Sequence, residues 1–389
     1  MFKIQTIAKS LVLVGIAGTM MGNQGCKEQT VDTSSTERQL RRRVQLGKID
    51  APVIQLPASF SNTKFNFGYA ANIQMYDILR KTQSFSTANI DPDASFDPSG
   101  LDDSAKGDFY KCEAEDQEMQ VYDYNTNARL KASVASKETL SSSAACLIDM
   151  PQAVIKGAIT NFQLTSGTGA SLSLGNIVAG LGLEGAFDFK KYTMTVSLMA
   201  KHPLEIGDHY FSTTVNSSYA NQRELSGKIT YQTFGFGLRS YMASDLSKVV
   251  DDGLSQAVTE LSNNWSTDDP WYAMVMRSCD KYVYINGGFG NDAGLKVGDI
   301  VKIANVKYFW KGDPCHSKLK GEIADKVVAY AKITSVGRNI AQAWIIENDP
   351  KYPHGSDKIY PGSRVYVEKL VEQVKAEEEA AKKAASGKK

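Results

Sequence analysis

The chain has 389 residues, and its 44 lysines and arginines nearly balance its 43 aspartates and glutamates. Hydrophobic residues make up 42% and charged residues 22%, as in a globular protein with room for two or three domains. The formal net charge of +1, without a basic stripe interleaved with aromatic residues, argues against nucleic-acid binding. We therefore expect no nucleic-acid partner.

The first 25 residues have the pattern of a secretory signal peptide. Lys3 and Lys9 are followed by an apolar run over 11–21, which is too short for a membrane-spanning helix. Cys26 comes directly after this segment, where bacterial lipoproteins are cut and lipidated, although Asn23 and Gln24 depart from the usual lipobox. We predict a signal peptide over 1–25 and a lipid on Cys26.

The residues after Cys26 predict where the protein is held. Lys27 stands where an Asp would favour the inner membrane in enterobacteria, so it is compatible with the outer membrane. Residues 26–49 are largely polar, which predicts a flexible lipidated tether. We expect an outer-membrane location on the periplasmic face.

Four cysteines remain once Cys26 is set aside, an even number that suits an oxidising compartment. By their order in the chain, they divide into Cys112 with Cys146 and Cys279 with Cys315. These two pairs are the predicted disulfides, and buried free thiols are the alternative.

An α+β domain is predicted over 50–270. Its expected elements are a strand at 52–56, a helix at 69–81, a strand near Phe85, an acidic loop over 91–109, strands at 153–164, 192–198 and 209–215, and a helix after Ser244 with apolar positions at Leu246, Val249, Val250, Leu254, Ala257, Val258, Leu261 and Trp265.

The acidic loop has spacings that resemble a calcium site. Asp91, Asp93, Ser95 and Asp102 fall at EF-hand ligand positions, but Phe96 stands where the turn needs glycine. We therefore expect a solvated loop and no metal.

Two glycine-rich or amphipathic inserts, 165–190 and 216–240, would leave the same end of the sheet if its three later strands are antiparallel. Gly180, Gly182 and Gly185 fit G-x-G-x-x-G, but a strand-like stretch follows them where a dinucleotide site needs a helix. We expect no nucleotide and no other cofactor.

The inserts alternate apolar and polar residues, which predicts β-hairpins. Such hairpins could cross a membrane only in an oligomer that closes one barrel, because isolated hairpins leave unpaired edges. Packing outside the membrane and a surface helix are the alternatives. The candidate membrane or subunit contacts are Leu172, Leu174, Ile177, Leu181, Leu183, Leu225, Ile229, Tyr231, Phe234 and Phe236.

Residues 50–265 resemble the curli secretion lipoprotein (CsgG-like) family. The resemblance lies in the order of PVIQLP, YAANIQMYDILRKTQSF, CLIDMPQAVIKGAITNF, KYTMTVSLMAKHPLEIGDHYFSTTV and ASDLSKVVDDGLSQAVTELSNNW. It implies a sheet with packing helices, and it places barrel hairpins where the two inserts fall. The acidic loop and the predicted Cys112–Cys146 pair depart from that family.

Residues 275–368 look like the small β-barrel domain that ends the flagellar assembly protein T family. Glycines at turns and alternating Val and Ile around Asn286–Gly288, GLKVGD and AQAWII carry this resemblance. It implies a small SH3-like barrel. The segment 369–389 is predicted to be a charged helical or disordered tail, in which Glu378 and Lys382 are spaced by four residues.

Nothing in the sequence predicts catalysis. His202, His209, His316 and His354 are scattered, and no catalytic triad order, H-E-x-x-H or C-x-x-C occurs. We expect a non-enzymatic homo-oligomeric ring that scaffolds an envelope or flagellar assembly. A curli-type secretion channel, in which the subunits share one barrel, and an envelope ligand-binding module are the alternatives.

Overall fold

We describe a computed structural model of the chain, in which the helices and strands belong to the compact unit Gln39–Lys389. The residues that the structure describes are 38–51, 66–87, 100–112, 118–130, 148, 151–173, 186–201, 215–230, 238–268, 270–290, 292–312, 318–353 and 358–386.

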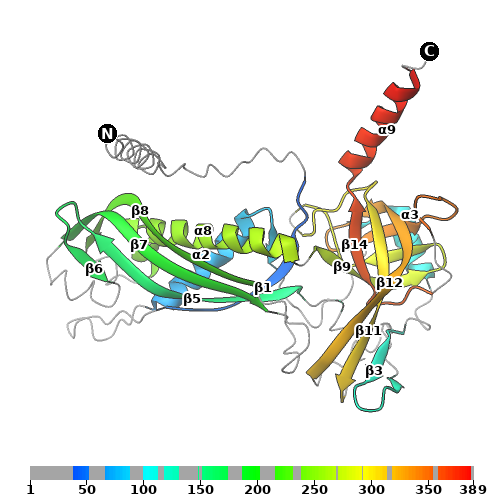
Figure 1. The fold of residues 1–389 in the computed structure, drawn as a ribbon, viewed down its shortest axis with the longest axis horizontal. Coiled ribbons are helices and arrows are strands. Elements are labelled where there is room, and N and C mark those ends of the chain that lie inside the picture. The colour runs from blue at the N-terminus through cyan, green and yellow to red at the C-terminus, as the bar shows by residue number, and fades with distance from the viewer. Residues whose placement is uncertain are drawn as a thin grey trace, which may run out of the picture. The chain divides into compact units, whose positions relative to one another are not determined.

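The first domain is built on a mixed sheet (Figure 1). Its strands are β1 (Arg42–Asp50), β2 (Phe85–Thr87), β5 (Ala153–Thr165), β6 (Ser171–Ser173), β7 (Ala186–Lys201) and β8 (Val215–Thr230). They run in the order β2-β1-β5-β7-β8, and β6 pairs with the end of β5. β1 is parallel to β2 and β5, whereas β5, β7 and β8 are antiparallel. The predicted strand at 209–215 lies outside the described residues except for Val215, where β8 begins.

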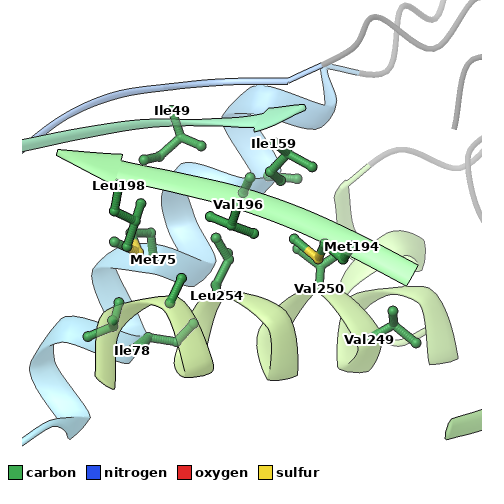
Figure 2. Close-up of a cluster of buried hydrophobic side chains, with 14 of the residues drawn as sticks. Ile49, Met75, Ile78, Ile159, Met194, Val196, Leu198, Val249, Val250 and Leu254 are labelled. Carbon is green, nitrogen blue, oxygen red and sulfur yellow. The ribbon is translucent and has the colours of Figure 1, made fainter. Parts of the chain in front are cut away.

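Two helices bury the apolar face of this sheet. They are α2 (Phe67–Lys81) and α8 (Asp245–Asp268), with the short α7 (Leu238–Met242) before α8. Figure 2 shows α2 and α8 packed below the sheet, with Met75 and Leu254 pointing toward Val196 and Leu198. Each of the eight apolar positions predicted for the α8 stripe is at most 2% exposed, so the 3.6-residue period identified this helix correctly.

A hydrogen-bonded chain of buried polar groups joins the helices within this core. Tyr241 Oη donates to Gln74 Oε1 at 2.8 Å, and Gln74 Nε2 donates to the carbonyl of Ser247 at 2.7 Å. Gln74 is 3% exposed, and these bonds satisfy both ends of its amide.

The prediction of a flexible tether over 26–49 was wrong for its last part. β1 begins at Arg42 and lies inside the sheet between β2 and β5, with Val44 and Ile49 fully buried. The charged residues gave this segment the composition of an exposed tether. Arg42 is nevertheless buried, with its guanidinium 5.2 Å from the ring centroid of Trp265. The predicted strand at 52–56 lies outside the described residues.

The second domain contains a closed six-stranded barrel. Its strands are β9 (Tyr272–Cys279), β10 (Tyr282–Ile285), β11 (Ile300–Lys311), β12 (Lys318–Val336), β13 (Ala341–Ile345) and β14 (Arg364–Lys369). They run in the order β12-β13-β10-β9-β14-β11, and pairing of β11 with β12 closes the ring. The chain thus combines an α+β sheet domain with a small barrel, as the sequence predicts.

A segment between β2 and β5 belongs to the barrel, which corrects the predicted domain limits of 50–270. It holds α3 (Asp103–Lys111), β3 (Val121–Asp123) and β4 (Arg129–Leu130), and β3 pairs in parallel with β11. The side chains that it buries against the barrel are Leu101, Ala105, Phe109, Met119, Val121 and Ile148. The barrel domain is therefore discontinuous in sequence.

The predicted acidic loop over 91–109 was wrong at its C-terminal end, where α3 begins. Asp102 is the N-cap of α3, and its carboxylate accepts a hydrogen bond from the amide of Ala105 at 2.9 Å. Asp91, Asp93 and Ser95, the other positions of the EF-hand spacing, lie outside the described residues.

Replacing Asp102 by alanine should lower the free energy of unfolding by about 1 kcal/mol, the usual cost of a lost N-cap. Hydrogen bonds from Ser335 and Ala105 lower the pKa of Asp102. Its contribution should therefore be present near neutral pH and lost as the pH falls through the lowered pKa. Urea unfolding at pH 7 and at pH 3 would measure this. Asp102→Asn should keep most of the stability at pH 7 and lose less at pH 3, whereas a pH dependence equal to that of the wild type would contradict this role.

The C-terminal helix α9 (Val371–Ser386) follows the barrel and has no buried residue, so of the two states predicted for the tail, helical or disordered, these residues have the helical one. Its start is fixed by the buried Asp299, whose carboxylate accepts a hydrogen bond from the amide of Val371 at 2.9 Å. Ion pairs from Lys296 to Glu372 and from Lys369 to Glu377 hold its first turns.

Candidate subunit-contact surface

The first predicted insert begins as a hairpin formed with the strand before it. β6 pairs back onto the end of β5, through a turn in which Gly169 has a φ of +86°. Leu172, a predicted lipid or subunit contact, pairs with Leu164 and is half-buried against the core of the sheet domain.

The rest of both inserts contributes mainly to the sheet itself. β7 begins at Ala186, and it pairs with β8 from Ala186↔Thr230 to Ala200↔Val215. Only 174–185 and 231–237 of the inserts therefore lie outside the described residues.

Ile229 was wrongly predicted as a membrane or subunit contact. Its side chain is fully buried in the core of the sheet domain, because α8 covers the face that the sequence left open. Leu225 lies in β8, but its side chain is not described. The candidates that lie outside the described residues are Leu174, Ile177, Leu181, Leu183, Tyr231, Phe234 and Phe236.

Gly227 offers the sequence signal that could have revealed this packing. A Cβ at Gly227 would lie 2.4 Å from Cβ of Asp245, so only glycine lets the start of α8 approach the strand this closely. The Asp245 carboxylate accepts a hydrogen bond from the amide of Lys228 at 3.0 Å, and this bond lowers the pKa of Asp245. The glycine therefore serves helix packing rather than a membrane strand.

The sheet has two open edges among the strands that the structure describes. Among these strands β8 pairs only with β7, so the outer side of this 16-residue strand has no partner strand. On the opposite side, the described part of the sheet ends at β2 and at β6, each three residues long. An unpaired edge of this length is a template for another chain. We therefore take the β8 edge as the candidate subunit contact.

Tyr192 and Arg223 fix the β7–β8 pair to α8. Tyr192 Oη donates a short hydrogen bond to the carboxylate of Asp252, and Arg223 Nη1 lies 3.0 Å from the same carboxylate. Asp252 thus binds a side chain from each strand, and this contact holds the edge strand in place before any partner binds.

The disulfide pairing of the sequence analysis was wrong. Cys112, at the end of α3, is bonded to Cys279 at the end of β9, with their Cα atoms 5.7 Å apart. Their sequence separation of 167 is why an argument from order in the chain did not pair them. Cys146 and Cys315, the predicted partners, and the predicted lipidation site Cys26 lie outside the described residues.

No group of three or more His, Cys, Asp or Glu side chains that could hold a metal occurs among the described residues. His202, His209, His316 and His354 lie outside them, as do the glycines of the G-x-G-x-x-G match. None of the described helices is both long enough and apolar enough to cross a membrane.

No protein-family model matches the chain, and no curated protein matches it. The resemblances to the curli secretion and flagellar assembly families therefore rest on the quoted residues and on the order of the elements.

Proposed function

We propose that the protein is an outer-membrane-anchored periplasmic lipoprotein that forms a homo-oligomeric ring and scaffolds an envelope or flagellar assembly. The observation that carries this proposal is the open edge of β8, together with a second open edge on the same sheet. Contacts between two different edges are heterologous, and heterologous contacts close into rings when the rotation between subunits permits.

Three further features support the proposal. The signal-like segment ending before Cys26 provides export and an anchor. The Cys112–Cys279 disulfide suits an oxidising compartment. The mixed sheet with its packing helices and the small barrel are compatible with the folds that the two resemblances imply.

The curli-type channel ranks second. The β5–β6 hairpin at the end of the sheet favours it, whereas burial of Ile229 favours the scaffold. The two functions predict different phenotypes on deletion: loss of motility with secretion intact for a flagellar scaffold, and loss of secretion with motility intact for a channel.

Proline substitution tests the β8 edge. In an antiparallel pair, successive residues of an edge strand turn their amides alternately toward the partner strand and away from it. Of Ser217→Pro and Ser218→Pro, one should therefore break a bond to β7 and destabilise the domain. The other should keep the wild-type melting temperature and abolish the ring.

Sedimentation of the lipidated protein in mild detergent would measure the mass of each variant beside the wild type. A wild-type monomer, or a ring that persists in both proline variants, would contradict the proposal.

A further inference from the structure

β11 and β12 form a ribbon that extends beyond the barrel, with β3 beside it (Figure 1). We call the ribbon part formed by 304–311 and 318–329 the arm. β12 pairs with β11 along the whole arm, but it pairs with β13 only from Ala331 onward. Among the described strands, none pairs with the outer edge of 318–329.

One face of the arm is anchored in the barrel domain. Leu319 and Trp310 are fully buried, and the buried Glu322 forms an ion pair with Arg364 of β14. The edge is therefore preformed, and a partner would not need to order it on binding.

An apolar groove of about 410 Å³ also lies against the arm. Phe309 lies in its floor, stacked on Tyr122 with ring centroids 5.7 Å apart, and Gly321 pairs opposite Phe309 without a side chain to fill the space. Tyr124 is 47% exposed and Ile323 is 55% exposed at its walls. Large apolar side chains this open, next to an open strand edge, are typical of a binding surface.

The charges at the groove are unbalanced. Glu322 is bound to Arg364, and Asp325 pairs with Lys307 at 3.5 Å. Within the described residues, Lys320 at the groove and Lys311 near the ribbon tip have no acidic partner. The surface therefore attracts a ligand that carries negative charge.

We propose that the arm binds an extended acidic segment of another protein, which adds as a strand to the outer edge of β12. Only an extended backbone satisfies a row of alternating donors and acceptors, and side chains on one face of that strand supply specificity through the adjacent groove. The segment would alternate apolar side chains over Phe309 and Ile323 with carboxylates near Lys320. A second copy that pairs this same edge of β12 with itself fits less well, because it would bring the same lysines together.

The probe is a fluorescein-labelled nine-residue peptide in which valine alternates with glutamate, titrated against the full chain with its disulfide intact. Fluorescence anisotropy should show saturable binding that weakens in high salt. A peptide with lysine in place of glutamate should bind at least tenfold more weakly. A peptide with N-methyl groups on the backbone amides that face β12 should not bind, because it cannot donate to the edge.

Two variants locate the site, and the first is compared with a matched control. Ile323→Lys should reduce binding at least tenfold, whereas Val297→Lys should not, although Val297 is 57% exposed. Lys320→Glu should reverse the preference between the glutamate and lysine peptides. Wild-type melting temperatures in all three variants would show that the fold is intact.

Three results would overturn this proposal: no binding of the glutamate peptide at 1 mM, equal binding of the lysine peptide, or equal loss in Val297→Lys. Loss of self-association in Ile323→Lys, with peptide binding unchanged, would assign the arm to a second copy of the chain instead. Because the β8 edge is tested separately, failure of this proposal leaves the ring proposal standing.

Discussion

Replacing Cys112 and Cys279 together by serine should lower the free energy of unfolding of the barrel domain by about 2–5 kcal/mol. The bond closes a loop with a sequence separation of 167 residues. On the chain-entropy argument, a loop of that size contributes about 5 kcal/mol, and strain or residual structure in the unfolded chain lowers this figure. The bond is the one covalent link between the inserted segment and the barrel among the described residues.

Urea unfolding, followed by tryptophan fluorescence, would measure the loss. Trp310 is fully buried in the barrel domain, and Trp265 in the sheet domain, so both cores contribute to the signal. The matched control is Cys146→Ser with Cys315→Ser, which should leave the Cys112–Cys279 bond intact. In the wild-type protein, peptide mapping without reductant should find Cys112 linked to Cys279. A Cys112–Cys146 link would restore the pairing inferred from the order of cysteines and overturn the structural one.

The contrast between the two pairings shows what order along a chain can reveal. Nearness in sequence favoured Cys146 for Cys112, but the inserted segment returns to the barrel and brings Cys112 to the end of β9. The correct pairing can be read only from the tertiary fold, because buried contacts hold the inserted segment against the barrel. One of them joins Phe109 and Tyr284, whose ring centroids are 4.9 Å apart.

Periodic segments were the most predictable part of the fold. α8 and the core strands β5 and β7 could be identified because one face of each is buried, and this imposes a period of 3.6 or 2. β1 was not predicted, because Arg42 is charged yet buried against Trp265. Composition alone therefore placed the tether too far along the chain.

The candidate site was predictable only in outline. The alternation around Ile229 correctly indicated a strand with one apolar face, but it could not say whether a helix or a lipid covers that face. The arm was missed because its open edge is a property of pairing, and its groove depends on Tyr124 lying near Ile323, about 200 residues further along the chain.

We also expect Arg364→Met to destabilise the barrel by about 3–5 kcal/mol. Arg364 binds Glu322 across the barrel wall, and the two side chains are 14% and 9% exposed. Its guanidinium also lies 4.4 Å from the ring centroid of Tyr272. Removing the arginine leaves a buried carboxylate without its counter-charge, which costs far more than losing an exposed pair.

A double-mutant cycle would separate the charge effect from lost packing. Glu322→Gln combined with Arg364→Met should recover most of the loss, because no uncompensated charge then remains buried. The control is Glu377→Gln, which breaks the more exposed pair with Lys369 and should cost far less than Arg364→Met. Equal losses in Arg364→Met and Glu377→Gln would show that the buried pair contributes no more than a surface one. Since Glu322 is on β12, Arg364→Met should also weaken peptide binding at the arm if this ion pair holds the open edge in place.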